Sequence, residues 1–257
     1  MALAFQAWAK GAVLEVQEYV RLLGRVGRGV VSPPFYYRDT IQQFDQIGFG
    51  SLTVVLLAGL FTGMVLALNS GITLDQFGAR SMVGRLISAS MVKELGPVLS
   101  GLMVSGRVGS GIAAELGSML VTDQIAALRA LGTDPVRKLV VPRVLAGVTM
   151  MPLLSILATG IGMVGGWIVS TLQFHVASTV YWTSVVQGLY MQDVWMGIVK
   201  PIFLGFTIVT IGCHVGLRAT GGTQGVGNAT KLSVVASSVA VIAVDFMVTK
   251  VLIVLMY

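Results

Sequence analysis

The sequence predicts an all-α integral membrane protein, and three observations support this fold class. The 257 residues are 55% hydrophobic and only 11% charged, whereas soluble domains carry about a quarter charged residues. Five stretches are long and apolar enough to cross a hydrocarbon core roughly 30 Å thick. The residues before them alternate apolar and charged positions at helical spacing. We therefore expect one domain over residues 1–257, with an interfacial region at 1–50 and a five-span bundle at 51–257.

The N-terminal region has the pattern of an amphipathic helix. Apolar and charged positions occupy different faces over residues 13–30: Val13, Val16, Val20, Leu23 and Val30 on one, and Glu18, Arg21, Arg25 and Arg28 on another. This pattern favours a helix lying in the membrane interface, anchored by Trp8 and stopped by Pro33-Pro34. An ordinary soluble surface helix is the alternative.

The five expected spans follow in order. They cover Ser51–Leu68, about Leu86–Ile112, Val144–Leu172 with Pro152 inside it, about Val194–Val215 with Lys200-Pro201 near its start, and Leu232–Tyr257. Glycine pairs with four-residue spacing, such as Gly59/Gly63, indicate close packing of helix backbones in lipid and point only weakly to a dimer.

Lysine and arginine counts predict the orientation. If the N-terminus is cytoplasmic, the inner segments 1–50, 114–143 and 216–231 hold five, four and two such residues, which makes eleven. The outer loops, about 69–85 and 173–193, hold only Arg80 and Arg85. Because cytoplasmic loops carry the excess of Lys and Arg, we expect the N-terminus inside and the C-terminus outside.

The inner connection between spans two and three predicts a short cytoplasmic helix. Thr122 or Asp123 is placed to cap it, Gly132 is placed to end it, and Ile125, Leu128 and Leu131 mark one apolar face. Such a face favours a partner protein, or else the helix is tucked against its own bundle.

Charged residues inside the spans are the strongest candidates for function, because each costs roughly 2.5–3.5 kcal/mol at mid-helix. Glu94 is too short to reach the membrane surface, so we expect it to face the bundle interior or a wet cavity. Lys93 points about 100° away from it, so the two need not pair. Arg107 lies near the inner interface, where it either anchors the helix or serves function. Asp245 is the next candidate for a polar lining residue.

Other classes of site lack their motifs. There is no G-x-x-x-x-G-K-[ST], so the chain itself is not expected to bind ATP. The single cysteine and the two distant histidines offer no metal-ligand spacing. No nucleophile–base pair suggests an enzyme, and no basic run with interleaved aromatics suggests nucleic acid. We therefore expect no cofactor on this chain.

Three segments resemble the MlaE/YrbE family of ABC-transporter permeases: "KELGPVLSGLMVSGRVGSGIAAELGSM" (93–119), "TDQIAALRALGTDPVRKLVVPR" (122–143) and "VDFMVTK" (244–250). The resemblance covers essentially the whole chain. It implies a permease homodimer in the inner membrane of a Gram-negative bacterium, working with a cytoplasmic ABC ATPase, a STAS-domain subunit and a periplasmic ring of MCE-domain proteins. Such systems move phospholipid between the inner membrane and the periplasmic carrier, in connection with outer-membrane lipid asymmetry.

The resemblance also implies roles for the candidate residues. ATP and Mg²⁺ would be bound on the partner ATPase, and the helix near 122–132 would be the coupling helix seated in that ATPase. Glu94 would lie in an outward-facing cavity between two permease copies, with Lys93 and Arg107 attracting phosphate. Two other hypotheses stay open: an ion-coupled secondary transporter with Glu94 and Asp245 as a relay, and a non-transporting scaffold for the periplasmic ring.

Overall fold

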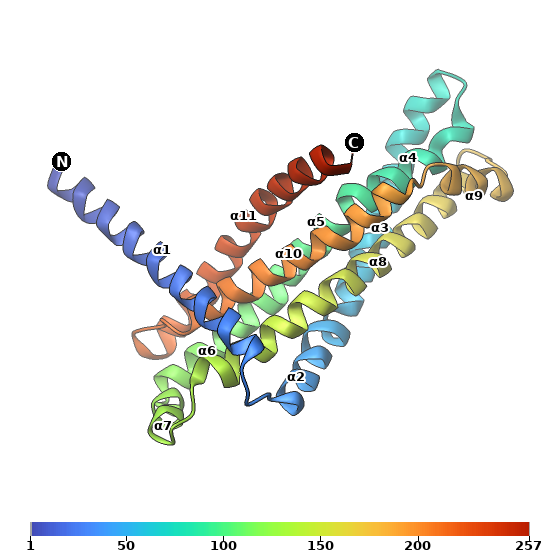
Figure 1. Cartoon of the computed structure of the whole chain (residues 1–257). Coiled ribbons are helices and arrows are strands. Elements are labelled where there is room, and N and C mark those ends of the chain that lie inside the picture. The colour runs from blue at the N-terminus through green and yellow to red at the C-terminus, as the bar shows by residue number, and fades with distance from the viewer. Residues whose placement is uncertain (1, 257) are drawn as a thin grey trace.

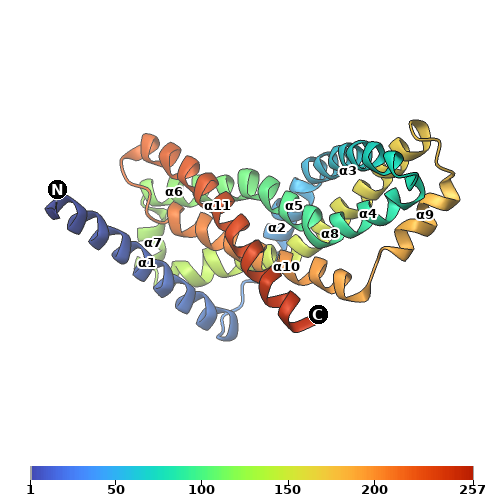
Figure 2. The ribbon, with the colours of Figure 1, turned by 90° about the horizontal axis from the view of Figure 1, so that it is seen from above.

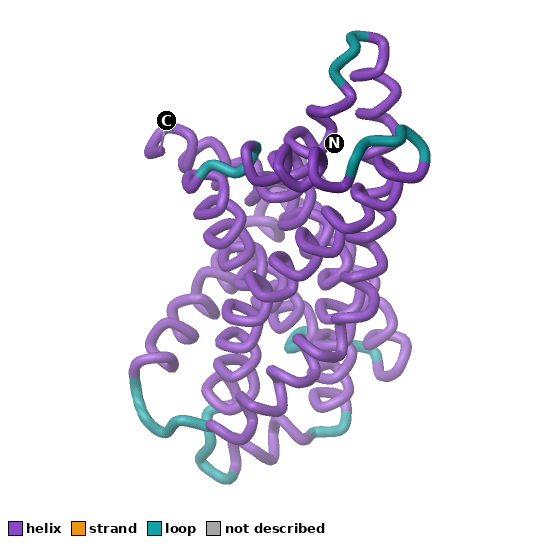
Figure 3. Tube along the Cα trace, turned by 90° about the vertical axis from the view of Figure 1, so that its right-hand side faces the viewer, coloured by secondary structure: helices purple, strands orange, loops and turns teal. Residues whose placement is uncertain are grey.

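The structure is a computed structural model that describes residues 2–256, without the side chains of residues 2–9, 11 and 12. All regular elements in this range are helical. The expected anchor Trp8 belongs to the side chains outside the description. The helices run side by side as an elongated bundle, and most of the loops gather at its two ends (Figures 1 and 3).

Five helical rods are long and apolar enough to cross a membrane, which confirms the predicted fold class. Span one joins α2 (Tyr37–Phe44), η1 (Asp45–Phe49) and α3 (Gly50–Gln76). Span two joins η2 (Arg80–Met82), α4 (Val83–Ser90), η3 (Met91–Leu95), α5 (Gly96–Val104), η4 (Ser105–Gly109) and α6 (Ser110–Val121). Span three joins η5 (Val136–Val140) and α8 (Val141–Leu172). Spans four and five are α10 (Met191–Gly216) and α11 (Gly222–Met256).

The spans are longer than the sequence predicts. The helical rod that contains span one begins at Tyr37, thirteen residues before the predicted bundle boundary at residue 50. Residues 222–231, expected in a loop, form the first turns of α11. Their glycine-rich composition is typical of a loop, but a side chain at Gly225 would collide with the carbonyl of Thr220, so the close approach there requires glycine.

The helix α1 (Ala2–Val31) crosses the bundle helices at a steep angle (Figure 1). Leu22 and Val26 are buried against the bundle, whereas Val13, Val16 and Val20 are exposed. The Tyr19 hydroxyl lies 2.7 Å from Thr210 Oγ1 in α10, and burial raises the pKa of this phenol. The helix is therefore amphipathic, with one face held by the bundle and the apolar valines pointing away.

Close backbone packing joins spans one and three, as seen from above in Figure 2, where α3 and α8 run side by side. A Cβ added to Gly63 would collide with the carbonyl of Gly162, and one at Gly59 would lie 2.5 Å from that of Ala158. These two glycines of α3 therefore serve packing within the chain.

Candidate functional site

A cluster of five charged side chains lies between spans two, four and five. Lys93 and Glu94 come from η3, Asp193 and Lys200 from α10, and Asp245 from α11. Of these, Lys200 and Asp193 are completely buried, and the Asp245 side chain is 10% exposed. Such burial is stable only when the charges pair with one another.

Lys200 is the centre of the cluster. Its Nζ lies 2.7 Å from Glu94 Oε2 and 3.3 Å from Asp245 Oδ1, and it donates a hydrogen bond of 2.7 Å to the main-chain oxygen of Lys93. One ammonium therefore joins three spans. Thr249 extends the link, because its hydroxyl donates to the Asp245 carbonyl at 2.7 Å and lies 3.5 Å from Glu94 Oε1.

The local sequence explains why the Lys93 carbonyl is free to accept this bond. In an α-helix it would accept from the N–H of residue 97, but Pro97 has none. The backbone before the proline widens into the π-helical turn Met91–Leu95, a feature that is frequent at functional sites. Gly197 lets α10 approach this turn, since a Cβ there would lie 2.8 Å from the Val92 oxygen.

Lys93 forms a second pair with Asp193. Its Nζ lies 2.9 Å from Asp193 Oδ1, and the aspartate sits in the first turn of α10, where the helix dipole favours an anion. The Lys93 side chain is 35% exposed and that of Glu94 is 43% exposed. The cluster therefore presents one ammonium and one carboxylate outward, on a base of buried partners.

Comparison with known proteins places the chain in a family. The family model for Permease MlaE matches residues 40–251. The chain belongs to the MlaE permease family. It is 41% identical to a probable ABC transporter permease protein of Rickettsia typhi over 87% of this chain and 86% of that one. It is 36% identical to a probable ABC transporter permease protein of Synechocystis over 96% and 90%.

A third relative carries a more specific name. The intermembrane phospholipid transport system permease protein MlaE of Haemophilus influenzae is 33% identical over 93% of this chain and 94% of its own length. The chain is thus a multi-pass membrane permease of the MlaE family.

The other predicted site residues of this MlaE-family permease lie away from the cluster. Arg107, in η4, donates to Ser51 Oγ at 3.0 Å and to the Gln46 carbonyl at 3.3 Å. Gly50 makes room for it, because a Cβ at residue 50 would lie 2.6 Å from Arg107 Nη1. Arg107 thus binds span two to span one, and the structure does not bring it to Glu94.

The short helix predicted between spans two and three exists as α7 (Gln124–Ala130), but its start differs from the prediction. The Asp123 side chain forms no capping bond, since residue 123 has φ +57°, and Thr122 donates back to the Ser118 carbonyl at 2.8 Å. The end agrees with the prediction. Gly132 has φ +75°, and a Schellman motif forms as Gly132 and Thr133 donate to Arg129 and Leu128.

The apolar face of α7 is divided between the permease and its surroundings. Ile125 is only 1% exposed and Leu128 is partly buried against the core, whereas Leu131 is 80% exposed. The expected apolar face is thus mostly covered by the chain itself, and only its end is free to meet another molecule.

Sequence reasoning missed Lys200 and Asp193 as parts of the site. Hydropathy places Lys200 only near the start of span four and Asp193 in the preceding loop, whereas α10 begins at Met191. The signal that would find Lys200 is the same cost of an intramembrane charge that singled out Glu94.

Proposed function

We propose that this chain is the membrane subunit of an ATP-driven transporter that moves phospholipids between the inner membrane and a periplasmic carrier of MCE-domain proteins. The observation that carries this proposal is the buried Lys200, paired with Glu94 and Asp245 inside an apolar bundle of the MlaE permease family. The name of the Haemophilus influenzae relative supports phospholipid as the substrate.

The geometry suggests how the cluster acts on lipid. The exposed parts of Lys93 and Glu94 offer a cation for a phosphate and an anion for a headgroup amine, while Asp193 and Lys200 hold them in place. The charges join η3, α10 and α11, so lipid that exchanges with these ion pairs biases the packing of three spans. Arg107 serves as an anchor between spans two and one.

The remaining parts of the proposal concern partners and placement. ATP and Mg²⁺ are bound by a cytoplasmic ABC ATPase, with α7 as the coupling helix and Leu131 as its free contact. A STAS-domain subunit accompanies the ATPase, and the transporter contributes to outer-membrane lipid asymmetry. The N-terminus is cytoplasmic and the C-terminus periplasmic, as eleven inner and two outer cationic residues favour.

A homodimer is part of the same proposal. The α11 helix is the least covered span. In its most apolar 18-residue stretch 17% is buried, against 28–50% in the corresponding stretches of the other spans. Val235, Val239, Ile242 and Phe246 expose an apolar row. We assign part of this row to a second copy, which would close a cavity beside Glu94.

The test is purification of the tagged chain from its native membranes in mild detergent, followed by mass spectrometry of bound proteins and lipids. An ATPase, an MCE-domain protein and stoichiometric phospholipid in one peak is the expected result. The chain alone, even after gentle cross-linking at residues 122–132, would overturn the proposal.

Two competing functions make different predictions. A lysine between two carboxylates is an arrangement that proton- or ion-coupled transporters also use. Lipid transport driven by an ion gradient without ATP would favour this secondary transporter, whereas unchanged lipid flux after any charge substitution in span two would favour a scaffold.

A further inference from the structure

A second charged site lies at the end of the bundle where α1 rests. A cavity of about 420 Å³ opens between α1, the α7–η5 connection and the end of α10. Four arginines line it from three separate elements: Arg21 and Arg25 of α1, Arg129 of α7, and Arg218 just after α10. None of these residues belongs to the cluster around Lys200.

Two carboxylates, Glu18 and Asp134, also line this cavity, and both have partners. Glu18 lies 2.9 Å from Arg218, which also pairs with Glu15 at 2.7 Å. Asp134 accepts the Val136 N–H at 3.0 Å and lies 3.9 Å from Arg137.

Three arginines are left with uncompensated charge. Arg21, Arg25 and Arg129 form no ion pair with any residue between 2 and 256 whose side chain is described. Arg21 and Arg25 are four residues apart, so they repel each other on one side of α1. His214 also lines the cavity. Four arginines against two carboxylates in the lining leave the cavity with an excess of positive charge, which suits an anionic ligand.

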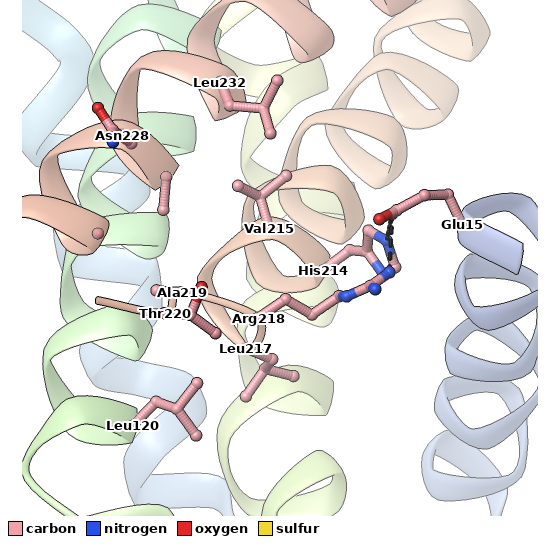
Figure 4. Close-up of a pocket in the computed structure, with 12 residues that line it drawn as sticks. Glu15, Leu120, His214, Val215, Leu217, Arg218, Ala219, Thr220, Asn228 and Leu232 are labelled. Atoms are coloured by element: carbon pink, nitrogen blue, oxygen red, sulfur yellow. Dashed lines mark hydrogen bonds and ion pairs between the residues drawn. The ribbon is translucent and has the colours of Figure 1, made fainter. Parts of the chain in front are cut away.

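The α1 helix is fixed firmly enough to hold such a site. Figure 4 shows the neighbouring cavity, where His214 and Arg218 at the end of α10 reach Glu15 on α1. The distances to Glu15 Oε2 are 3.4 Å from His214 Nε2 and 2.7 Å from Arg218 Nη1. The two cavities share His214, Leu217 and Arg218, so the same contacts that attach α1 also form one wall of the arginine cavity.

The position of α1 identifies the source of the anion. Val13, Val16 and Val20 are 66%, 63% and 58% exposed, and this apolar face belongs in the boundary between headgroups and acyl chains. Arg21 points about 100° away from Val20. With the valines in that boundary, the arginines would lie on the flank of the helix at the level of lipid phosphates, where basic pockets bind anionic headgroups.

We propose that this cavity binds the phosphate of an anionic phospholipid from the surrounding leaflet, as a resident ligand that joins α1 to α7. Guanidinium groups bind phosphate through two parallel N–H···O bonds, and groups from α1 and α7 on one phosphate would tie the two helices together. The site is independent of the transport path, because it shares no residue with the cluster around Glu94.

The experiment uses the full chain with its accompanying subunits, purified in mild detergent and equilibrated with mixed micelles of phosphatidylcholine and phosphatidylglycerol. Mass spectrometry then counts phosphatidylglycerol retained per chain over a titration. We expect Arg25→Gln and Arg129→Gln each to weaken retention about tenfold, the equivalent of one charge-assisted hydrogen bond. Arg28→Gln is the matched control, with the same charge change on α1 outside the cavity, and it should retain the lipid.

Three outcomes decide the proposal. Loss in both cavity variants, with retention in Arg28→Gln, supports a resident lipid in the arginine cavity. If Arg129→Gln retains as much phosphatidylglycerol as wild type, the proposal is overturned. This variant is decisive because the substituted residue lies on α7 and not on α1. Displacement of the lipid by millimolar inorganic phosphate shows a site for a soluble phosphate and overturns the lipid as its occupant.

Discussion

The Lys200 ammonium lies 2.7 Å from Glu94 Oε2, although 106 residues separate the two along the chain. The lysine side chain is fully buried and the glutamate is 43% exposed. One partner is thus fixed inside the bundle, while the other reaches outward. This asymmetry suits a site that keeps its structure while an exposed carboxylate exchanges partners.

Removal of the buried ammonium should strongly destabilise the folded chain. Lys200→Met leaves Asp245 as a buried carboxylate without its cation, and such a loss costs about 3–5 kcal/mol. We expect a clearly lower thermal unfolding midpoint in detergent. The double variant Lys200→Met/Asp245→Asn removes the orphaned charge and should recover much of the loss.

The exposed pair Arg80–Asp75 provides the control for this measurement. Its side chains are 49% and 39% exposed, so Arg80→Gln should change stability by no more than about 1 kcal/mol. The contradicting result is a double variant that unfolds at the same temperature as Lys200→Met. It would show that the lysine stabilises through packing alone.

The packing of spans one and three should depend on Gly63. Any side chain there meets the Gly162 carbonyl, so Gly63→Ala should destabilise by about 1–3 kcal/mol. Gly160→Ala is the matched control, because a Cβ at that position of α8 has nothing within 4 Å. It should be neutral or stabilise by up to about 1 kcal/mol. Thermal unfolding of the two variants compares them directly, and equal melting would contradict the close packing.

The two ends of the α7 face should respond differently to charge. Leu131→Glu alters an 80% exposed side chain, so the chain should melt normally but lose co-purification of the ATPase and its ATP hydrolysis. Ile125→Glu buries a carboxylate in the core and should lower the melting temperature of the chain itself. Normal ATP hydrolysis in Leu131→Glu would remove this residue from the coupling contact.

Much of the fold follows from hydropathy, whereas the ends of its elements do not. A run such as 51–68 is long enough to require a span. Hydropathy, however, marks only the apolar middle of a helix, so it does not predict that residues 37–49 and 222–231 belong to the same helices. The predicted start of α7 was wrong for another reason. Residue 123 takes a left-handed conformation that the sequence alone does not indicate for aspartate.

For the candidate site, the sequence indicated which charges need partners but not which partners they have. Glu94 and Asp245 stood out by their cost in an apolar span. Their common partner Lys200 comes from a third helix, and the carbonyl it also binds is free because of Pro97. Such pairing depends on how the spans pack, so only the structure shows it.

The most direct test of the central claim is the rate of phospholipid transfer by the intact complex in proteoliposomes, with Glu94→Lys against wild type. The substitution places a second ammonium beside Lys200 and removes the outward carboxylate. We predict assembly and ATPase co-purification as in wild type, with transfer at least about tenfold slower, since a charge-assisted hydrogen bond contributes roughly 1.5–3 kcal/mol. Asp75→Asn, an exposed carboxylate outside the cluster, should transfer lipid normally. A wild-type rate in Glu94→Lys would contradict the account and remove the cluster from the lipid path.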